Sequence, residues 1–275
     1  SAGGYTIGGS TITLDGLAGI AAIYVAAGSH TISSPLVLAD DLNITVRNVS
    51  STLNLTGAVT ATGKTINKDG PGAVTMANIR ASALNVIAGK VQIAANVQAN
   101  DPAGASTLDS LSIAGGAQLD LGNNSLHVAN ASVESVRPLL FQGQLTSSSA
   151  NSTSRIGYQT DAGGVDVEFA LAGDTNLDGV VDATDLGNLA LAWETNGHWA
   201  GGDFDYNGIV DVNDLALMAA NWQGSGAMPT AALGLPDVSA VPEPGGLMLV
   251  LGGLVAVLSN ARRRSQGLQR RIDLL

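Results

Sequence analysis

The sequence predicts a mainly β chain in three parts: a parallel β-helix or solenoid, a small α-helical domain and a C-terminal transmembrane helix. Three observations support this prediction. Residues 1–135 consist of short runs in which apolar and polar residues alternate, separated by Gly, Asn and Asp, as in half-buried strands. Residues 173–223 contain one loop pattern twice, each copy followed by helical periodicity. Residues 245–259 form an apolar run that precedes a cluster of arginines.

The composition supports an extended β architecture. The 275 residues are rich in Gly and small polar residues, include 4% aromatic residues and contain no Cys, which excludes disulfides and thiolate metal sites. The net charge of −11 is uneven, because residues 173–223 hold nine acidic residues and no Lys or Arg. A nucleic-acid partner is not expected, since no basic face is available to neutralise phosphates. The chain starts without an initiator Met, so we expect the C-terminal part of a longer protein.

The strands of residues 1–135 predict a solenoid in which each turn buries its apolar face on the next turn. A β-sandwich is the alternative. Gly- and Asn-containing turns at 88–89, 115–116 and 123–124 separate the runs. The clearest strands are 11–14, 42–46, 52–55, 84–86, 91–93, 111–113, 119–121 and 126–128.

One stretch of this region carries a family resemblance. Lys68-Asp-Gly-Pro-Gly-Ala-Val-Thr-Met76, followed by the strands at 84–93, resembles the autotransporter-associated β-strand repeat of bacterial surface proteins. Val74 and Met76 stand where that repeat usually has Leu. The resemblance implies a right-handed parallel β-helix on an exported protein, and the wider stretch is similar to long exported proteins of planctomycete-type bacteria.

Residues 136–172 are expected to bridge the solenoid and the helical domain. The segment 136–141 predicts a short helix, and the Ser/Thr/Asn-rich segment 144–155 predicts a loop. Residues 165–171 alternate cleanly and predict a strand that leads into the duplicated loops. After those loops, residues 224–241 are small, dotted with Pro and aperiodic, which is typical of a linker.

The duplicated loops predict two calcium sites. The copies start at Asp174 and Asp203, and each has Gly at its sixth position, Gly179 and Gly208. Calcium takes about six to eight oxygen ligands, and Gly permits the sharp turn around the ion. The alternative is a pair of Asp/Asn/Gly turns without metal. Oxygen side chains occupy positions 1, 3, 5, 9 and 12 of both copies: Asp174, Asn176, Asp178, Asp182, Asp185; Asp203, Asp205, Asn207, Asp211, Asp214.

Position 12 is Asp rather than the Glu of an EF-hand, and each loop leads into an apolar helical pattern that contains a Trp. This tandem resembles a dockerin module. The resemblance implies the ligand set given above, additional backbone carbonyl ligands at Val180 and Ile209, and partner contacts at residues 183–184 and 212–213. Only Ala183 and Thr184 match the small/hydroxyl pair of members that bind a cohesin. We expect the metal-free loops to be disordered and calcium to supply folding free energy.

The aromatic residues near the loops are expected to be structural. Trp193, Trp199 and Trp222 are all the Trp residues of the chain and are predicted to pack the two helices together. An exposed platform for a partner or glycan is the alternative. His198 is expected to be a solvated linker residue.

The C-terminal segment predicts a membrane anchor or sorting signal. Its apolar run, residues 245–259, would span roughly 22 Å as a helix, short of the ~20 residues of a stable anchor. The arginines that follow mark the cytoplasmic side, so the rest of the chain would lie on the opposite side of the membrane, outside the cytosol. Pro242, Glu243 and Pro244, the apolar run, and Arg262, Arg263 and Arg264 together resemble a PEP-CTERM sorting signal. That resemblance implies processing by exosortase; a plain anchor is the alternative.

These observations predict an exported structural or adhesive protein of the cell surface or extracellular matrix, transiently anchored in the inner membrane, rather than an enzyme. Acidic residues are sparse in residues 1–135, and Asp40-Asp41, the only adjacent pair, is expected to be a solvated turn. Nucleophile, zinc-protease and phosphate-loop motifs are absent from the sequence. Two alternatives stay open: a module that docks to a cohesin-like partner, and a polysaccharide-active β-helix enzyme.

Overall fold

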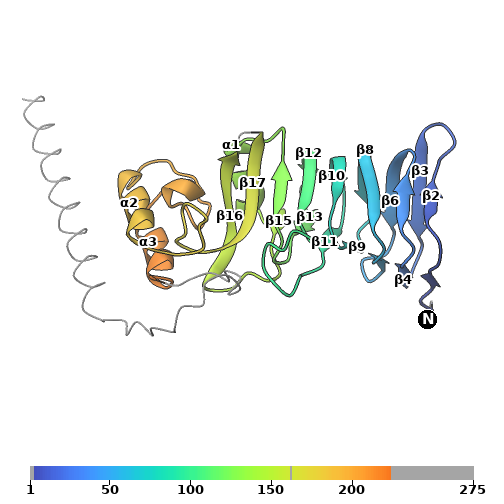
Figure 1. Cartoon of the computed structure of the whole chain (residues 1–275), viewed down its shortest axis with the longest axis horizontal. Coiled ribbons are helices and arrows are strands. Elements are labelled where there is room, and N and C mark those ends of the chain that lie inside the picture. Colours follow the sequence, from blue (N-terminus) through green and yellow to red (C-terminus); the bar gives the residue numbers. More distant parts are fainter. Residues whose placement is uncertain (1–2, 162, 224–275) are drawn as a thin grey trace, which may run out of the picture. The chain divides into compact units, whose positions relative to one another are not determined.

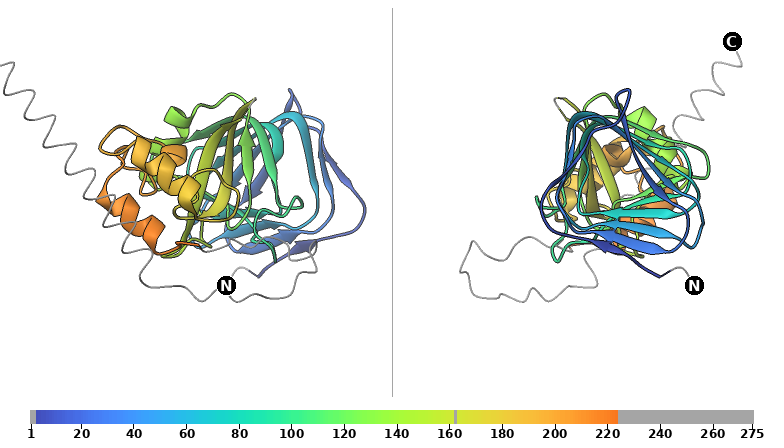
Figure 2. Two further views of the ribbon diagram at one scale, coloured as in Figure 1. Left: turned by 60° about the vertical axis from the view of Figure 1, so that its left-hand side comes forward. Right: turned by 90° about the vertical axis from the view of Figure 1, so that its right-hand side faces the viewer.

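A computed structural model describes residues 3–161 and 163–223, all within one compact unit that runs from Ser1 to Met228. The described part is mainly β, and its central feature is a parallel β-solenoid of about six turns (Figure 1). Seen along the stacking direction, the turns superimpose as a closed coil (Figure 2). The predicted solenoid is therefore confirmed against the β-sandwich alternative.

Two sheets run along the solenoid. The seven-stranded sheet has the spatial order β1 (Thr6–Ile7), β4 (Ser29–Ile32), β7 (Thr52–Leu55), β9 (Ala73–Met76), β11 (Lys90–Ile93), β13 (Gln118–Asp120) and β15 (Leu145–Thr146). The ten-stranded sheet contains β2 (Ile12–Leu14), β3 (Ile20–Val25), β5 (Leu36–Leu38), β6 (Asp41–Val46), β8 (Val59–Asp69), β10 (Arg80–Val86), β12 (Ser106–Ile113), β14 (Leu126–Val128), β17 (Gly164–Leu171) and β16 (Ser154–Asp161).

Successive turns pair in parallel, but their lengths differ. Ala73 in β9 pairs with Lys90 in β11, which in turn pairs with Gln118 in β13. The turn from Ala73 to Lys90 is therefore much shorter than the next turn, from Lys90 to Gln118. This unequal spacing explains why the sequence repetition is loose even though the strands are in regular register.

The core consists of apolar columns that run across the turns. In the seven-stranded sheet, Leu53, Val74, Val91, Leu119 and Leu145 are stacked by the strand register, and each is at most 1% exposed. Side chains on alternate strand positions point outward. The apolar–polar alternation in the sequence therefore reports the inner and outer faces directly, and every strand predicted from it is present.

The solenoid ends in a cap that consists of helix α1 (Val133–Phe141) and strands β16 and β17. Helix α1 confirms the helix predicted at 136–141 and begins a little earlier than predicted. Strand β17 confirms the strand predicted at 165–171, and it pairs antiparallel with both β14 and β16. The predicted loop at 144–155 is partly wrong, because β15 and the start of β16 lie within it. Pairing with ordered neighbouring strands outweighs the loop-like Ser/Thr/Asn composition there.

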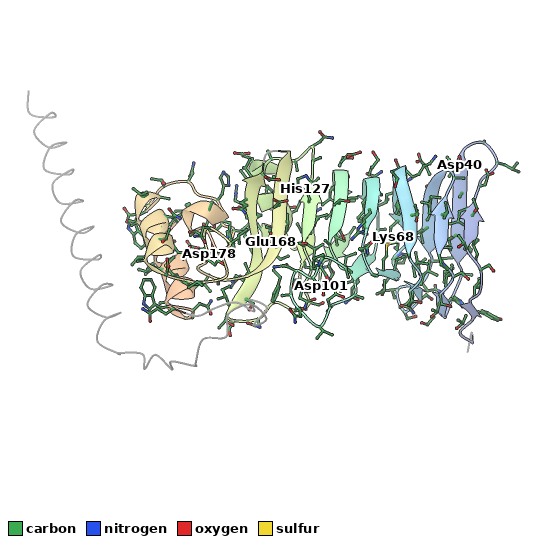
Figure 3. All side chains as sticks on the ribbon, viewed as in Figure 1. Asp40, Lys68, Asp101, His127, Glu168 and Asp178 are labelled. Atoms are coloured by element: carbon green, nitrogen blue, oxygen red, sulfur yellow. The ribbon has the colours of Figure 1, made fainter. Side chains whose placement is uncertain are left out.

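Lys68 is an unexpected member of the core (Figure 3). It lies between Ile44 and Val86 in an inward-facing column and is 0% exposed. Burial lowers the pKa of Lys68 to about 8, so the amine is protonated at neutral pH. The ammonium donates to the carbonyl oxygens of Asp69, Gly70 and Ala88 at 3.1, 2.7 and 2.9 Å, which ties a corner of one turn to the next.

We expect Lys68→Met to destabilise the solenoid by about 1–3 kcal/mol. Met keeps the apolar stem, but three part-buried carbonyl groups lose a charged donor, and relief of the buried charge offsets part of that loss. Thermal unfolding measures the effect, with Lys64→Met on the same strand, β8, as the matched control. Equal melting temperatures for the two variants would show that the carbonyl contacts are energetically neutral.

No helix among residues 3–161 and 163–223 is long and apolar enough to cross a membrane. The predicted linker at 224–241, the sorting motif at 242–244, the apolar run at 245–259 and the arginines at 262–264 lie outside the described residues. The predicted boundaries at residues 135 and 172 stay predictions, although the sheets continue beyond residue 135 through β15, β16 and β17.

Candidate metal centre

The duplicated segment forms two loop–helix units after β17. Helix α2 (Ala183–Leu191) follows the first loop, α3 (Val212–Ala219) follows the second, and a short 3₁₀ helix, η1 (Trp199–Gly201), lies between them. The N-caps are Asp182 and Asp211, whose carboxylates each accept a backbone N–H at 2.7 Å. The structure places the cap at loop position 9, and the last Asp completes a capping box.

The two units have the same backbone conformation at equivalent loop positions. Leu177 and Tyr206, at loop position 4, have φ values of 57° and 64°, and Gly179 and Gly208 have φ values of 88° and 90°. Such left-handed conformations are unusual for residues with a Cβ. Each loop is also braced by the segment after the other helix: Glu194 N–H donates to Val210 O at 2.9 Å, and Gln223 N–H to Val181 O at 2.7 Å.

The first loop gathers its predicted side chains around buried carboxylates. Asp174 is 1% exposed and Asp185 is 0% exposed. Asp174 accepts the N–H groups of Asp178 and Gly179 at 3.2 and 2.9 Å. Asp185 accepts the N–H of Thr175 at 2.8 Å and that of Asp182 at 2.9 Å. The loop backbone is thus wrapped around the carboxylates of positions 1 and 12.

The second loop repeats this arrangement and adds a third carboxylate. Ligand-type oxygens of Asp203, Asp205 and Asp214 all lie within 4.8 Å of one another, and Asp203 and Asp214 are 0% exposed. Asp203 Oδ2 accepts the N–H of Gly208 at 3.0 Å. Asp203 Oδ1 is buried and has no hydrogen-bond partner in the described part of the chain. A buried carboxylate oxygen without a partner is costly, and a bound cation would satisfy it.

In both loops the pKa of the carboxyl group at position 1 is raised. Burial, followed by the charge of Asp214, raises the pKa of Asp203 to about 7. Burial, with smaller contributions from Asp185 and Asp178, raises the pKa of Asp174 to about 6. Within the described residues, no salt bridge joins a loop carboxylate to Lys or Arg. The charge of Arg137 lowers the pKa of Asp203 but does not outweigh burial and the charge of Asp214. An added cation would relieve both the burial of charge and the repulsion between carboxylates.

No family model, characterised protein or solved structure matches this chain. The metal assignment therefore rests on the donor chemistry. Hard oxygen donors in a Gly-containing loop suit calcium, whereas zinc prefers Cys and His ligands. The ten side-chain ligands, and the carbonyl ligands assigned to Val180 and Ile209, stay predictions.

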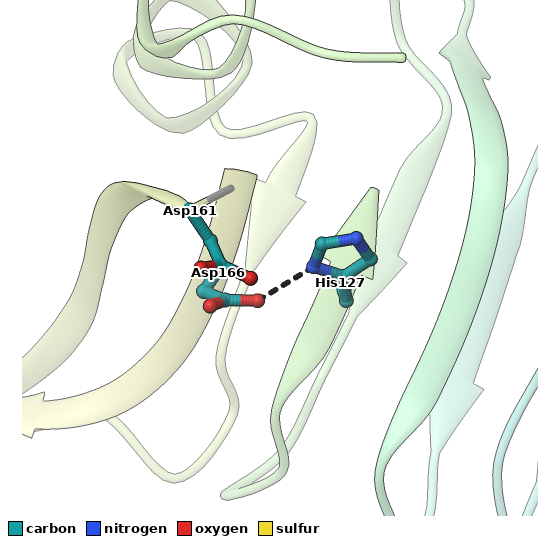
Figure 4. A group of neighbouring side chains, drawn as sticks. All are labelled: His127, Asp161 and Asp166. Atoms are coloured by element: carbon teal, nitrogen blue, oxygen red, sulfur yellow. Dashed lines mark hydrogen bonds and ion pairs between the residues drawn. The ribbon is translucent and has the colours of Figure 1, made fainter. Parts of the chain in front are cut away.

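A second group of metal-ligating residues lies on the ten-stranded sheet (Figure 4). His127 in β14 is directly opposite Asp166 in β17, its Nδ1 lies 2.7 Å from Asp166 Oδ1, and Asp161 at the end of β16 completes the group. His127 and Asp166 are about one-third exposed, at 30% and 31%. This group could not be predicted from the sequence, because the strand register brings its residues together. The His–Asp hydrogen bond accounts for the pair without a metal.

The Trp and His residues near the loops, and the predicted partner-contact residues, lie in different environments. Trp199 is 0% exposed and donates Nε1–H to Asp174 O at 2.6 Å, so it packs beneath the loops rather than only between the helices. Trp193 and Trp222 are partly exposed. His198 Nε2 lies 3.5 Å from a carboxylate oxygen of Glu134 in α1. His198 therefore contacts the cap and is not only a solvated linker residue, as predicted. The predicted partner-contact residues at 183–184 and 212–213 are exposed.

The expected solvated turn at Asp40-Asp41 is only partly confirmed: Asp40 lies in a bend just before β6, Asp41 is the first residue of that strand, and both are half-buried. Asp40 Oδ2 accepts the N–H of Gly16 at 2.9 Å, and Asp41 Oδ1 accepts the N–H of Thr65 at 2.8 Å. Both side chains therefore connect neighbouring turns of the solenoid. The sequence shows adjacent acids, but the parallel stacking that supplies their backbone donors is a tertiary feature.

The raised pKa values predict opposite pH responses for metal-free and calcium-bound protein. Asp203 and Asp174 have folded pKa values of about 7 and 6, above about 3.9 in an unfolded chain. Between about pH 4 and 7 the metal-free folded state binds more protons, so its stability falls as pH rises. Calcium would have to displace these protons, so calcium affinity should fall about tenfold per pH unit below about pH 7 at the second loop and below about pH 6 at the first loop. Calorimetric titrations at pH 8, 7, 6 and 5 measure this, and a pH-independent affinity would contradict it.

Proposed function

We propose that the chain is a structural or adhesive component of the bacterial cell surface or extracellular matrix whose duplicated loops bind two calcium ions. The solenoid supplies an elongated scaffold, because each turn stacks only on its neighbours. The loops supply a calcium-dependent element at the end of that scaffold. Docking to a cohesin-like partner and action on polysaccharides are the alternatives that sequence analysis left open.

One observation carries the calcium proposal: the same oxygen-lined loop occurs twice, with matching backbone conformation, and one copy buries a carboxylate oxygen without a partner among the described residues. Turns that serve only the backbone need one carboxylate to accept N–H groups. The second loop instead brings three carboxylates within 4.8 Å. This arrangement is unfavourable without a cation and favourable with one.

The surface assignment rests on the resemblance of residues 242–275 to an exosortase-processed sorting signal and of the solenoid to surface-protein repeats. Such a protein would meet millimolar extracellular calcium, at which weak sites are still filled. Its acidic loops would then be neutralised outside the cell. An exopolysaccharide is the partner that suits a surface or matrix protein, and a cohesin-like protein is the partner that the dockerin resemblance of residues 173–223 implies.

The test is calorimetric calcium titration of the chelator-treated full chain, kept in mild detergent because of its apolar C-terminal run. Two calcium ions per chain are expected, and equimolar magnesium should compete weakly because its octahedral geometry fits these loops poorly. A pull-down with and without chelator distinguishes docking, which requires a calcium-dependent stoichiometric protein partner. No heat of binding at millimolar calcium would reduce the loops to ordinary turns.

A further inference from the structure

The side chain at the fourth position of each loop contacts the solenoid cap. This is visible in two close approaches to β16. The phenol of Tyr206 in the second loop donates to Ile156 O at 2.9 Å and accepts Ile156 N–H at 3.1 Å. In the first loop, Leu177 Cδ2 would lie 2.5 Å from a Cβ added to Gly157. The two loops therefore contact adjacent residues of the same strand.

Strand β16 has an open edge that these contacts cover. In the described part of the chain it is the outer strand of the ten-stranded sheet, paired on one side with β17. The N–H and C=O of Ile156 point to its open edge, and Tyr206 satisfies both groups with one hydroxyl. Edge strands with unsatisfied backbone groups are open to unwanted pairing, so the second loop ends the sheet at this point.

Further contacts fix the same interface from both sides. Arg137 in α1 donates Nη1–H to Tyr206 O at 3.1 Å. Asn221, after α3, donates to the carbonyl oxygens of Thr153 and Ala172, both at 2.7 Å. These hydrogen bonds join the loop module to α1 and to the segments that flank β16 and β17.

Trp199 lies between the loops and the cap. Its ring stacks on Tyr206 with centroids 6.2 Å apart, and its Cε2 would be 2.9 Å from a Cβ on Gly157. Any side chain at residue 157 would therefore displace Leu177 or Trp199. The glycine lets both groups pack directly on the backbone of β16.

We infer that the two calcium loops close the C-terminal end of the solenoid, so that calcium binding locks β16 and the last turns in place. The ion orders the loop, the ordered loop holds its fourth residue in the left-handed conformation, and that residue holds the edge of β16. This inference rests on the proposed calcium function and adds a partner for the loops: the cap of the same chain. Calcium should therefore stabilise strands that contain none of its ligands.

The test is amide hydrogen exchange of the full chain with and without calcium, beside the calorimetric titration. At a free calcium concentration about 100 times the dissociation constant, openings that require metal release slow about 100-fold. We expect this slowing at residues 154–161 and 164–171 and little change in β6, because solenoid turns interact mainly with their neighbours. The double variant Leu177→Ala/Tyr206→Phe leaves every proposed ligand side chain intact. Its calcium response at residues 154–161 should be at least about tenfold smaller.

The matched control is Tyr24→Phe, which removes a phenol hydroxyl from β3, where it accepts Arg47 Nη1–H at 3.3 Å. This variant should keep the full calcium response. If wild-type protein binds calcium and exchange at residues 154–161 does not change, the lock is wrong and the calcium function stands. If calorimetry shows no binding, the proposed function is wrong and the inference fails with it.

Discussion

Replacing Asp203 by Asn is expected to weaken calcium binding at the second loop by on the order of 100-fold, because calcium affinity depends strongly on ligand charge. The same change should make the metal-free protein more stable. Burial and Asp214 raise the pKa of Asp203 to about 7, so above that pH the metal-free loop holds an unfavourable charge. Asn has the same shape and still offers an oxygen to Gly208 N–H. We expect the metal-free melting temperature to rise by at least about 2 °C at pH 8.

This pairing of effects separates a metal ligand from a structural carboxylate. If Asp203 served only to cap the loop, Asn would lower stability both with and without calcium. Calorimetric titration should show one tight site left, at the first loop, and thermal unfolding in chelator should show the stabilisation. Asp15→Asn, at an exposed residue near the N-terminal turn, has the same charge change and should alter neither quantity. A variant that retains two equal sites would contradict the assignment.

The solenoid could be predicted because its physical cause is local. Leu53 and Leu55 in β7, and Val91 and Ile93 in β11, alternate with polar residues because one face of each strand is buried. The loop–helix units were predictable for a related reason: each contains, in one short segment, the glycine and the oxygen side chains that shape its turn. In both cases the residues that form the recognisable pattern lie close together in the sequence.

Features that depend on stacking between turns could not be predicted from the sequence. Lys68 lies in the interior because Ala88, on the next turn, offers a carbonyl oxygen to it. Residues 154–155 resembled a loop until β17 provided a partner. Likewise, nothing in the sequence shows that Tyr206 reaches Ile156, a residue far away along the chain. The unequal lengths of successive turns obscure which residues are neighbours.

The docked loops also bear on the alternative of an external protein partner. Tyr206 and Leu177 are used by the cap, whereas Thr184 and Val212 at the starts of α2 and α3 stay exposed. Val212 is 64% exposed. A docking partner would therefore contact the helix starts and leave the contacts to β16 intact. Contact of the loops with β16 and docking to an external protein can therefore coexist. The pull-down with and without chelator tests for the external partner.

Trp199→Ala should cause the largest loss of stability among single substitutions in the loop module, about 3–5 kcal/mol, the usual cost of removing a buried aromatic side chain. Trp199 is 0% exposed and contacts Phe204 edge-on at a centroid distance of 5.0 Å. Its Nε1–H also holds the carbonyl of Asp174, the first residue of the first loop. The cavity would therefore remove support from both loops and from β16 at once.

Urea unfolding with and without calcium measures this loss of stability. Two further variants separate the contribution of the indole N–H from that of the buried ring. Trp199→Phe keeps most of the ring volume and loses the N–H, so it should cost roughly 1–2 kcal/mol. Trp193→Ala removes a partly exposed ring of the same type and should cost less than Trp199→Ala. Because the Trp199 cavity loosens the contact between loops and cap, calcium should restore less stability to Trp199→Ala than it adds to the wild type. Full restoration by calcium would show that the loops order themselves independently of β16, and the lock would then lie elsewhere.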